Sequence, residues 1–539
     1  MKRPRLTPRA SDPDLDAVII GAGHNGLVCA GYLARAGLKV AVVERRPIVG
    51  GACVTEEFLP GFRNSSCAYL VGLLAPEVIR DLDLHRHGLE ILERAGGTFS
   101  PALDGSAIEL LPDMAAMRAQ LSDADAAAYA ELAGLLDRAA TVMRAMARER
   151  APELQGGLGA LWQAGRAARH LRHLPAADRA DFAALMLKSL GDFLDERFES
   201  AAFKGVYGFK GLVGNMVSPY ATGSAYVLLH HVFGEVNGKR GKWGQPRGGM
   251  GAITEAMRRS LATRGGQVLT GCGVREVITE GGRAGGVVLE DGRSLRARLV
   301  VSSINPRLLF LNMLDAGLLK PAFLRRMRAW RCRSGTFRMN VALSELPDFT
   351  ARPGKSLQRH HQGTVTIAPS LDYLERAFDD ARRLGWARQP VISMCLPTTI
   401  DPSLAPEARH IAGLFCQHFN PVLPEGQSWH DHRDTVARLI IDTIGRYAPN
   451  FPGAVLGYKA LSPLDLEEEY GLVGGDIFHG EMHLDQLFSL RPAVGAADHG
   501  TPVPGLFQCG SGTHPGGGVT GLPGWNAARA ILRRQRALA

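Results

Sequence analysis

A strand, a glycine-rich turn, a helix and a second strand follow one another near the start of the chain, and this arrangement constrains the fold most. Residues 16–20 (DAVII) form an apolar run of strand length that passes directly into residues 21–26 (GAGHNG). The apolar spacing favours a helix over residues 27–36, and residues 39–43 (KVAVV) favour a second strand that ends in Glu44. The segment therefore predicts a βαβ unit with buried, parallel strands.

The turn has the spacing G-x-G-x-x-G, which is typical of dinucleotide-binding folds. Its first glycine allows a sharp turn, the second lets the backbone approach a diphosphate, and the third lets the helix pack closely on the strand. Unpaired N–H groups at the start of the helix attract the diphosphate. The expected cofactor-binding residues of the turn are Gly21, Ala22, Gly23, His24, Asn25 and Gly26. A Rossmann-like unit that binds no nucleotide is the alternative.

Glu44 ends the second strand, at the distance from the turn that the dinucleotide-binding pattern requires. A carboxylate at this position accepts hydrogen bonds from the ribose hydroxyls of an adenosine. The same carboxylate repels a 2′-phosphate, so we expect the site to reject NADP. For His24, which lies within the turn, we expect a hydrogen bond to nearby backbone.

Length and composition indicate a large globular protein. The 539 residues allow about three domains, or two with long insertions. Apolar residues make up 45% and charged residues 21%, which excludes collagen-like, coiled-coil and disordered chains. The formal net charge of +9 favours acidic partners or an anionic membrane surface, although an Arg-rich proteome explains it more simply. Aromatic residues amount to 7% and do not recur within a basic groove, so we expect no nucleic acid partner.

The eight cysteines are scattered, without a C-x-x-C pair, so the sequence predicts neither a disulfide framework nor a zinc site. A reducing compartment fits this usage. The first residues are basic but lack the apolar centre of a secretory signal, and no run of about 18 uncharged apolar residues occurs. We therefore expect a cytoplasmic protein that does not span a membrane, or a mitochondrial one if the source is eukaryotic.

Glycine-rich, helix-like and β-prone segments alternate along the sequence, and this alternation predicts two interleaved domains. Ala-, Leu- and Arg-rich helical segments follow the first glycine-rich part, and short β-prone runs separated by turns begin at residue 337. The expected parts are a disordered tail at 1–14; the dinucleotide-binding domain in three pieces at 15–112, 236–306 and 496–539; a helical substrate-domain insertion at 113–235; and the sheet of the substrate domain at 307–495.

The stretch ERRPIVGG begins at Glu44 and ends in the doublet Gly50-Gly51. It resembles the extended FAD signature shared by monoamine oxidases and phytoene desaturases. The resemblance implies FAD as the cofactor, with Arg46 near the adenosine or the diphosphate and with Arg45, Gly50 and Gly51 as further contacts. Those families often have an arginine directly after the doublet, where this chain has Ala52.

Two later segments resemble the same family. Residues 273–277 (GVREV) resemble the strand whose valine backbone holds the adenine, which implies Val274. Residues 505–521 (GLFQCGSGTHPGGGVTG) resemble the flavin-capping motif of carotenoid desaturases and isomerases. A glycine-rich turn before a helix brings backbone N–H groups to the flavin edge that becomes negative on reduction. The implied contacts are Gly510, Ser511, Thr513, Gly518 and Val519.

A narrower resemblance runs nearly from end to end. The segments GAGHNGLVCAGYL, SAYVLLHHVFGE, GGMGAITEAM, VVLEDG and CGSGTHPGGGVTG are similar to a group of phytoene-desaturase-like flavoproteins with a mitochondrial vertebrate member. The resemblance implies an α/β fold. In it, a Rossmann-type FAD-binding domain, like those of glutathione reductase and the amine oxidases, is interleaved with a substrate domain of helices and a mixed or antiparallel sheet.

Disulfide reductase chemistry is not expected. Such enzymes need two thiols beside the flavin, and where Cys53 would have its partner the chain has Phe58. The nearest second glycine motif, residues 271–276 (GCGVRE), has Glu276 in the third glycine position, so we expect no nicotinamide site. Electrons are therefore expected to come from an organic substrate and to pass to oxygen or a quinone.

Two histidines are candidate catalytic residues. His514 lies in the flavin-capping motif, and His231 lies in the apolar run 226–233, where it could accept a proton from substrate. A structural role is the alternative for each. No catalytic motif need stand out, because the flavin takes the hydride and the protein orients the reacting bond.

Residues 474–492 contain His479, Glu481, His483 and Asp485 at alternating positions. Such alternation places side chains along one edge rather than around a point, so we expect no metal site. In the related desaturases this region contributes to the substrate cavity, and the resemblance implies the same here.

The favoured function is an FAD-dependent oxidoreductase that takes a hydride from a C–H or C–N bond of a lipophilic small molecule. Two alternatives stay open: a flavin-assisted double-bond isomerase with no net oxidation, and a flavoprotein with a structural or regulatory partner role.

Arg-rich helices such as residues 138–150 could rest on an anionic bilayer, although a solvated face explains them as well. The oligomeric state is not predicted.

Overall fold

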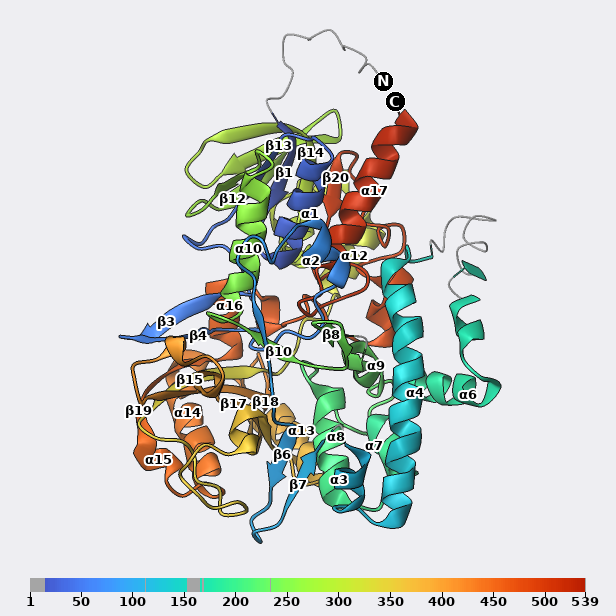
Figure 1. Ribbon diagram of the computed structural model, residues 1–539. Helices are drawn as coiled ribbons and strands as arrows, with labels where there is room; N and C mark the ends of the chain where they lie inside the picture. Colours follow the sequence, from blue (N-terminus) through green and yellow to red (C-terminus); the bar gives the residue numbers. More distant parts are fainter. Residues whose placement is uncertain (1–14, 112, 153–164, 167–168, 233, 539) are drawn as a thin grey trace.

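The computed structural model describes residues 15–111, 113–152, 165–166, 169–232 and 234–538; the expected disordered tail at 1–14 lies outside them. Three groups of elements are visible in Figure 1. One sheet with its helices forms the upper half, a second sheet lies at the lower left, and a group of helices lies at the lower right. The expected α/β architecture is confirmed.

The first sheet has seven strands: β1 (Leu15–Ile20), β2 (Val40–Val43), β11 (Gln267–Leu269), β12 (Val274–Glu280), β13 (Arg283–Leu289), β14 (Ser294–Ser302) and β20 (Leu506–Gln508). Their order is β11-β2-β1-β14-β13-β12, and β20 also pairs with β14. The pairs β1·β2, β1·β14, β2·β11 and β14·β20 are parallel, whereas β12, β13 and the start of β14 form an antiparallel meander. The predicted βαβ unit is therefore present, and it occupies the centre of the sheet.

Three helices that are far apart in the sequence cover one face of this sheet: α1 (His24–Arg35), α10 (Gly251–Ala262) and α17 (Leu522–Leu538). Gly524 lies so close to α1 that an added Cβ would come within 2.2 Å of the Asn25 carbonyl oxygen. On the other face, α11 (Pro306–Asn312) and α12 (Pro321–Arg328) pack against β12, β13 and β14. Parallel strands covered on both faces are necessarily apolar throughout, as β2 is.

The second sheet has the order β19-β15-β18-β17-β16-β6-β7 and is antiparallel except for the pair β16·β6. Its strands are β6 (Thr98–Pro101), β7 (Ala107–Leu110), β15 (Phe337–Leu343), β16 (Thr364–Ile367), β17 (Trp386–Cys395), β18 (His410–Phe419) and β19 (Val455–Leu461). The expected mixed sheet is thus confirmed. Strands β6 and β7 belong to it although the predicted boundary at residue 112 would place them in the first domain, because β6 pairs with β16, which is far from it in the sequence.

Helices α13 (Leu371–Leu384), α14 (Trp429–Gly445) and α15 (Phe451–Ala454) accompany the second sheet. Successive side chains of a strand point to opposite faces. Ile392 and Met394 pack in the core with α14, whereas Ser393 between them faces the interior of the molecule and lines a cavity. The alternation places Thr366 of β16 and Phe415 of β18 on that same inner face.

The helical part contains α3 (Met114–Arg118), α4 (Asp123–Arg148), α6 (Ala176–Leu187), α7 (Leu190–Asp195), α8 (Ala201–Leu212), α9 (Tyr226–Val232) and the short η1 (His170–His173). Ser122 caps α4, since its hydroxyl accepts a hydrogen bond from the Asp125 N–H at 3.1 Å. The buried faces of these helices form one core with Phe415 of the second sheet. The helices therefore close the molecule opposite the second sheet.

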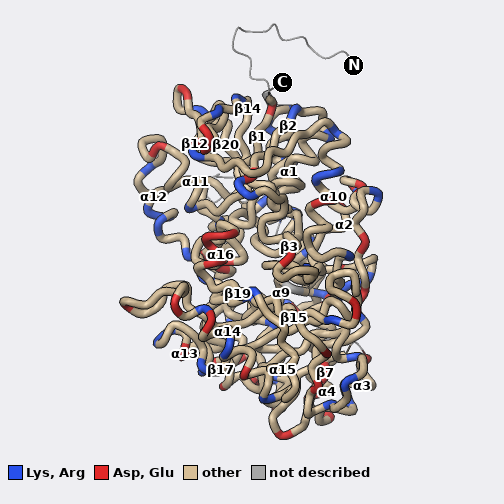
Figure 2. Tube along the Cα trace, turned by 90° about the vertical axis from the view of Figure 1, so that its left-hand side faces the viewer, with Lys and Arg blue, Asp and Glu red and all other residues tan. Residues whose placement is uncertain are grey.

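The remaining elements connect these parts. They are α2 (Pro76–Asp81), β3 (Thr55–Leu59), β4 (Phe62–Ser65), β5 (Ile91–Glu93), β8 (Glu235–Val236), β9 (Lys239–Arg240), β10 (Gly244–Pro246), α16 (Pro463–Tyr470), η2 (Ala316–Leu318), η3 (Arg359–Gln362), η4 (Pro397–Thr399), η5 (Pro402–Leu404), η6 (Val473–Gly475), η7 (Leu484–Gln486) and η8 (Phe488–Leu490). Figure 2 shows that acidic and basic residues are interspersed along the chain, with an acidic group on α16 between the two halves. Among the described helices, none combines the length and the apolar character that a bilayer span requires.

Candidate active site

One cavity of about 890 Å³ extends from the first sheet to the second sheet and the helical part. This volume lies at the upper end of the usual range for cofactor and small-molecule sites. Its walls come from segments at both ends of the chain and from the middle: the β1–α1 turn, the end of β2, the second sheet, α4, α8 and the residues before α17. Twelve of the expected cofactor-binding residues line it: Gly21, Gly23, His24, Asn25, Glu44, Arg45, Arg46, Gly51, Val274, Ser511, Gly518 and Val519.

Glu44 marks one end of the cavity. Backbone N–H groups hold its carboxylate on both sides, because Ala22 donates to Oε2 at 2.8 Å and Arg46 donates to Oε1 at 3.0 Å. Val274, the first residue of β12, lines the cavity beside it. These bonds orient the carboxylate and leave lone pairs on both oxygens for ribose hydroxyls.

The two glycine motifs form a narrow backbone cradle next to Glu44. Gly50 donates a hydrogen bond to the Ala22 carbonyl at 2.9 Å, and a Cβ added to Gly51 would stand 3.4 Å from the Gly23 Cα. A Cβ added to Gly23 would meet no atom closer than 4.0 Å, so its Cα faces open cavity space. Gly26 has the opposite setting, because its Cβ would lie 2.2 Å from the Gly21 carbonyl oxygen. The cradle therefore exposes backbone where a diphosphate would need it.

The last segment of the chain closes over this cradle. Asn25 Nδ2 donates to Ser511 Oγ at 3.1 Å, and His24 Nε2 lies 3.2 Å from the Gly518 carbonyl oxygen. Burial lowers the pKa of His24 to about 4, so its ring is neutral and can donate that bond. Gly510 and Thr513 shape the turn from outside the cavity, since the Thr513 hydroxyl donates to the Gly510 carbonyl at 2.8 Å. The expected backbone contact for His24 is confirmed.

Six buried polar atoms of the lining lack a hydrogen-bond partner: Asn25 Oδ1, Arg46 Nη1 and His479 Nδ1 at the cradle end, and Arg94 Nε, Thr366 Oγ1 and Ser393 Oγ near the second sheet. Buried polar groups are nearly always paired, so unpaired ones that face a cavity indicate a polar ligand. Arg46 is otherwise held in place, because Nη2 contacts Glu56 Oε1 at 2.6 Å and its guanidinium lies 4.5 Å from the centroid of the Tyr470 ring. The donor set, the open Gly23 and the anchored Glu44 fit an adenine dinucleotide such as FAD.

Beyond the cradle the cavity becomes largely apolar. Its walls there include Leu73, Leu111, Leu136, Phe209, Leu228 and Phe415. Tyr69 stacks on Phe415 with ring centroids 5.8 Å apart, and Phe415 lies 6.4 Å from Phe209 by the same measure. These aromatic rings connect the cofactor end of the cavity with α8.

Of the two expected catalytic histidines, the structure describes the side chain of His514, which does not lie on the cavity wall. His514 is buried outside the lining, with Nε2 3.0 Å from the Met146 carbonyl oxygen, and burial lowers its pKa to about 4. The side chain of His231 lies outside the described residues. Its neighbour His230 contacts the Gly517 carbonyl oxygen at 2.9 Å. The position of His514 therefore supports the structural alternative, because packing of α4 against the motif turns its ring away from the cavity.

Cys53 and the glycine-containing turn at residues 271–273 were not expected to support disulfide reduction, and the structure shows the surroundings of each. Cys53 is buried, its Sγ donates to the Met250 carbonyl at 3.3 Å, and burial raises the pKa of its thiol. All eight cysteines are free and buried. The turn at residues 271–273 leads into strand β12 and not into a helix, so it presents no helix N-terminus to a second dinucleotide.

The segment at residues 474–492 lines the cavity only in part. Ile477, Phe478 and His479 face the cavity, and burial lowers the pKa of His479 to about 4. The expectation is wrong for Glu481, His483 and Asp485, which lie outside the wall of this cavity. Glu481 and Asp485 instead form ion pairs with Arg331, at 2.6 Å to Glu481 Oε2 and 2.7 Å to Asp485 Oδ1.

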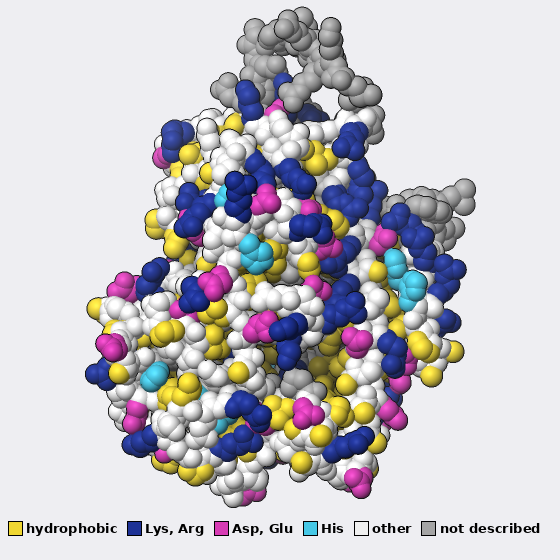
Figure 3. Space-filling model, in the orientation of Figure 1, with side chains coloured by type: hydrophobic (Ala, Val, Ile, Leu, Met, Phe, Trp, Pro, Cys, Tyr) yellow, Lys and Arg dark blue, Asp and Glu magenta, His cyan; other side chains and the backbone are white. Residues whose placement is uncertain are grey.

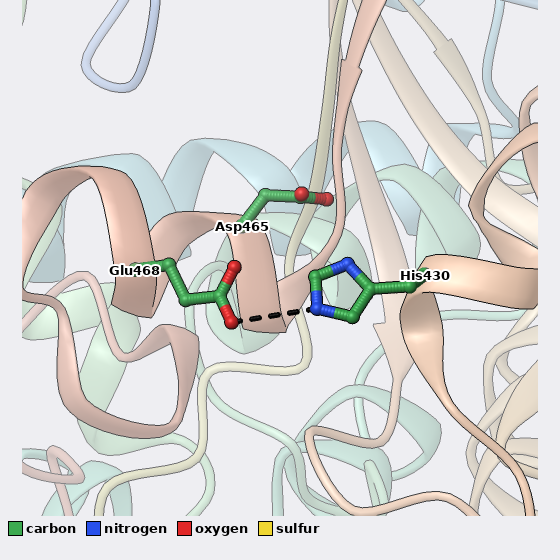
Figure 4. Close-up of side chains that lie close together, drawn as sticks. All are labelled: His430, Asp465 and Glu468. Carbon is green, nitrogen blue, oxygen red and sulfur yellow. Dashed lines mark ion pairs between the residues drawn. The ribbon is translucent and has the colours of Figure 1, made fainter.

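The described residues contain one cluster with the spacing of a metal site, formed by His430 of α14 and by Asp465 and Glu468 of α16 (Figure 4). Its ligand atoms already have partners. His430 Nε2 lies 3.4 Å from Glu468 Oε1, and Asp465 accepts hydrogen bonds from Arg433 and from Ser462 at the start of α16. The cluster thus forms an ion-pair network that joins two helices, and its three residues are not part of the cavity wall.

Several lining residues were not predicted from the sequence. Tyr69, Lys210, Thr366, Ser393 and Phe415 come from separate elements or loops, and no local pattern connects them. For Lys210 a signal was present, since it is the one charged residue in the otherwise apolar stretch at residues 205–213. Strand alternation could have placed Ser393 and Phe415 on one face, but not beside a cavity.

Comparison with known proteins identifies the family. Residues 26–336 match the family model for flavin containing amine oxidoreductases. The chain belongs to this flavin-containing family. The matched residues include Glu44 and Val274, so the family assignment covers the cofactor end of the cavity.

Two of the similar proteins match over nearly the whole chain and a third over more than half of it. Pyridine nucleotide-disulfide oxidoreductase domain-containing protein 2 of Mus musculus is 39% identical over 545 residues, which covers 97% of this chain and 94% of the relative. A limonene dehydrogenase subunit of Castellaniella defragrans is 25% identical, with coverages of 96% and 94%. A phytoene desaturase (lycopene-forming) of Pantoea ananas is 26% identical over 60% of this chain and 61% of the relative. The expected resemblance to phytoene-desaturase-like flavoproteins is confirmed.

The fold of this family member agrees with solved flavoenzymes. Cyclohexylamine oxidase from Brevibacterium oxydans superimposes with a TM-score of 0.57 at 17% identity, over 97% of this chain and all of that one. At this identity the likeness concerns the fold. It confirms the predicted amine-oxidase-like α/β architecture.

Proposed function

We propose that the protein is an FAD-dependent oxidoreductase that takes a hydride from a lipophilic small molecule and passes the electrons to oxygen or a quinone. The observation that carries this proposal is the continuous cavity, which joins the glycine cradle and Glu44 to an apolar space between the second sheet, α4 and α8. A dinucleotide bound in the cradle would extend toward that space. The same cavity then holds cofactor and substrate together.

The chain's own residues supply binding and orientation. Glu44 would accept the ribose hydroxyls, the backbone at Gly23 and Gly51 would hold the diphosphate, and Gly518 and Val519 would border the flavin. FAD, when bound, supplies the hydride acceptor. The aromatic and aliphatic walls exclude water and hold the reacting bond in place, which is the contribution that such a site needs from its protein.

The apolar walls support oxidation of a C–H bond more strongly than oxidation of an amine. Glu290 lines the cofactor end of the cavity beside Val274; among the described residues that line the cavity beyond the cradle, the one carboxylate is that of Asp137, which is exposed. A protonated amine would therefore find no buried counter-ion there. Limonene dehydrogenase and phytoene desaturase, whose names denote hydrocarbon substrates, are among the relatives, and they favour the same class for this chain.

The test is the visible spectrum of the purified protein, followed by identification of the released cofactor. We expect a flavin band, release of FAD on denaturation, and no bleaching under anaerobic conditions when NADH or NADPH is added. Bleaching by a nicotinamide nucleotide, or absence of FAD after reconstitution, would overturn the proposal.

A substrate screen completes this test. Anaerobic addition of terpenes and other apolar alkenes should bleach the flavin band for the matching substrate class, with recovery on admission of oxygen or a soluble quinone. A product with the mass of its substrate would favour the isomerase alternative.

A further inference from the structure

Lys210 is a cation placed in the apolar part of the cavity. It lies on α8 and lines the cavity together with its neighbours Tyr207 and Phe209. The neighbouring helix α4 contributes Tyr129 and Leu136 to the lining, and the Tyr129 ring lies 6.1 Å from that of Tyr207 by their centroids. The Lys210 Nζ lies 5.2 Å from the centroid of the Tyr207 ring, so the ammonium rests beside an aromatic face.

Lys210 has no carboxylate partner among the residues that the structure describes. Lys204, on the same helix, contacts Asp195 Oδ1 at 2.6 Å, and Lys188, Lys239 and Lys459 likewise contact carboxylates. Asp137 lines the same cavity from α4 but is exposed and forms no ion pair with Lys210. An ammonium in apolar surroundings without a counter-ion is costly, which is why such groups are nearly always paired.

The electrostatics of this position agree with its geometry. Desolvation lowers the pKa of Lys210 to about 8, and no charged neighbour contributes to the shift. At neutral pH the ammonium form still predominates, so the apolar space holds a positive charge with free hydrogen-bond donors. The phenols of Tyr129 and Tyr207 add polar atoms to this part of the wall, and Arg94, Arg240 and Lys242 are further cations of the cavity lining.

We propose that Lys210 binds the carboxylate of an amphiphilic substrate whose apolar chain extends along the cavity toward the cofactor end. The proposal rests on the oxidoreductase function proposed above and specifies its substrate class, a monocarboxylic acid with a long apolar chain. The aromatic rings of Phe209, Phe415 and Tyr69 lead from Lys210 to the cradle, so they would contact that chain. The cation also disfavours amines, since two like charges in one apolar cavity repel each other.

The test is calorimetric titration of the FAD-loaded protein with decanoate, 1-decanol and decylamine. We expect decanoate to bind at least about 10-fold more tightly than 1-decanol, because the alcohol cannot form the charge-assisted bond to the half-buried ammonium. Decylamine should bind most weakly. Equal affinities for decanoate and 1-decanol in the unmodified protein would overturn the proposal.

Substitution of Lys210 tests whether this residue causes the preference for decanoate over 1-decanol. Lys210→Met should weaken decanoate at least about 10-fold and leave 1-decanol within about twofold, whereas Lys210→Arg should keep the preference for the acid. Lys204→Met is the matched control, since Lys204 is on the same helix and already paired, and it should change neither affinity. An unchanged preference for the acid in folded Lys210→Met would overturn the assignment.

The result of this titration can be distinguished from the result of the test of the proposed oxidoreductase function. Acid preference is measured without turnover, whereas the oxidoreductase proposal is judged from FAD content and flavin reduction. Retained FAD without acid preference would refute only the substrate class, and acid preference in FAD-loaded protein whose flavin no donor reduces would refute only the oxidoreductase.

Discussion

The backbone N–H of Ala22 donates a hydrogen bond of 2.8 Å to Oε2 of Glu44, which joins the glycine turn after β1 to the end of β2. A second N–H, from Arg46, binds the other carboxylate oxygen at 3.0 Å. The carboxylate is therefore oriented before any ligand binds. On the molecular face shown in Figure 3, Lys and Arg side chains are numerous along the right-hand edge, and acidic side chains lie among them.

Replacement of Glu44 by alanine should weaken FAD binding by at least about 10-fold. Hydrogen bonds to a charged group contribute roughly 1.5–3 kcal/mol each, and the variant loses those to the ribose. Titration of the apoprotein with FAD, followed by flavin fluorescence, measures the change. Glu44→Gln keeps an acceptor and should lose less; equal affinity in wild type and Glu44→Ala would refute the ribose assignment.

Two glycines of one motif should respond differently to alanine. Gly23→Ala meets no atom closer than 4.0 Å, so the apoprotein should unfold at nearly the wild-type denaturant concentration while FAD binding is lost. Gly26→Ala places a methyl group 2.2 Å from the Gly21 carbonyl oxygen and should reduce the free energy of unfolding by about 1–3 kcal/mol. Denaturant titrations of both apoproteins, paired with FAD titrations, check this contrast. Tight FAD binding by Gly23→Ala would show that the diphosphate lies elsewhere.

The thiols should be inert in the folded protein. All eight cysteines are free and buried, and burial raises the pKa of Cys53 and Cys416. A thiol reagent such as DTNB should react with all eight only after denaturation, and Cys53→Ser should retain FAD and its spectrum. Rapid reaction of a thiol pair in the native protein, or reduction of a small disulfide substrate, would contradict this expectation.

Stability should fall as the pH is lowered from about 6.5 to 5. Burial lowers the pKa values of His24, His479, His499 and His514 from 6.5 to about 4. Below 6.5 the unfolded chain binds protons that the folded protein does not bind until about pH 4, so each histidine removes at most about 1.4 kcal/mol per pH unit in this window. The free energy of unfolding, measured in denaturant at pH 7, 6 and 5, tests the slope.

Replacement of one of these histidines measures its contribution to the pH dependence of the free energy of unfolding. His514→Gln should flatten the slope by about one proton relative to the wild type. A slope that is the same in His514→Gln and in the wild type would mean that this ring is protonated in the folded protein. Its placement away from the cavity also predicts that His514→Gln keeps its bound FAD.

Much of the first domain could be predicted because its signals are local. Residues 16–20 and 39–43 were expected as strands, and they correspond to β1 and β2 of the first sheet. The boundary at residue 112 failed to anticipate β6 and β7, because a short strand carries no information about a distant partner. The alternating acidic and histidine positions at 479–485 were misassigned in part, since Arg331, which is distant in the sequence, binds Glu481 and Asp485.

The βαβ unit, the glycine spacing and the position of Glu44 follow from local sequence, because they depend on backbone conformation and apolar periodicity within one short segment. Which of the distant segments meet at the cavity follows from tertiary packing instead. The bond from Asn25 to Ser511 joins the two ends of the chain, and it places the final motif over the first turn. Tertiary packing likewise turned the His514 ring toward Met146 and left Lys210 without a counter-ion among the described residues, because burial and pairing follow from contacts between elements and not from local sequence.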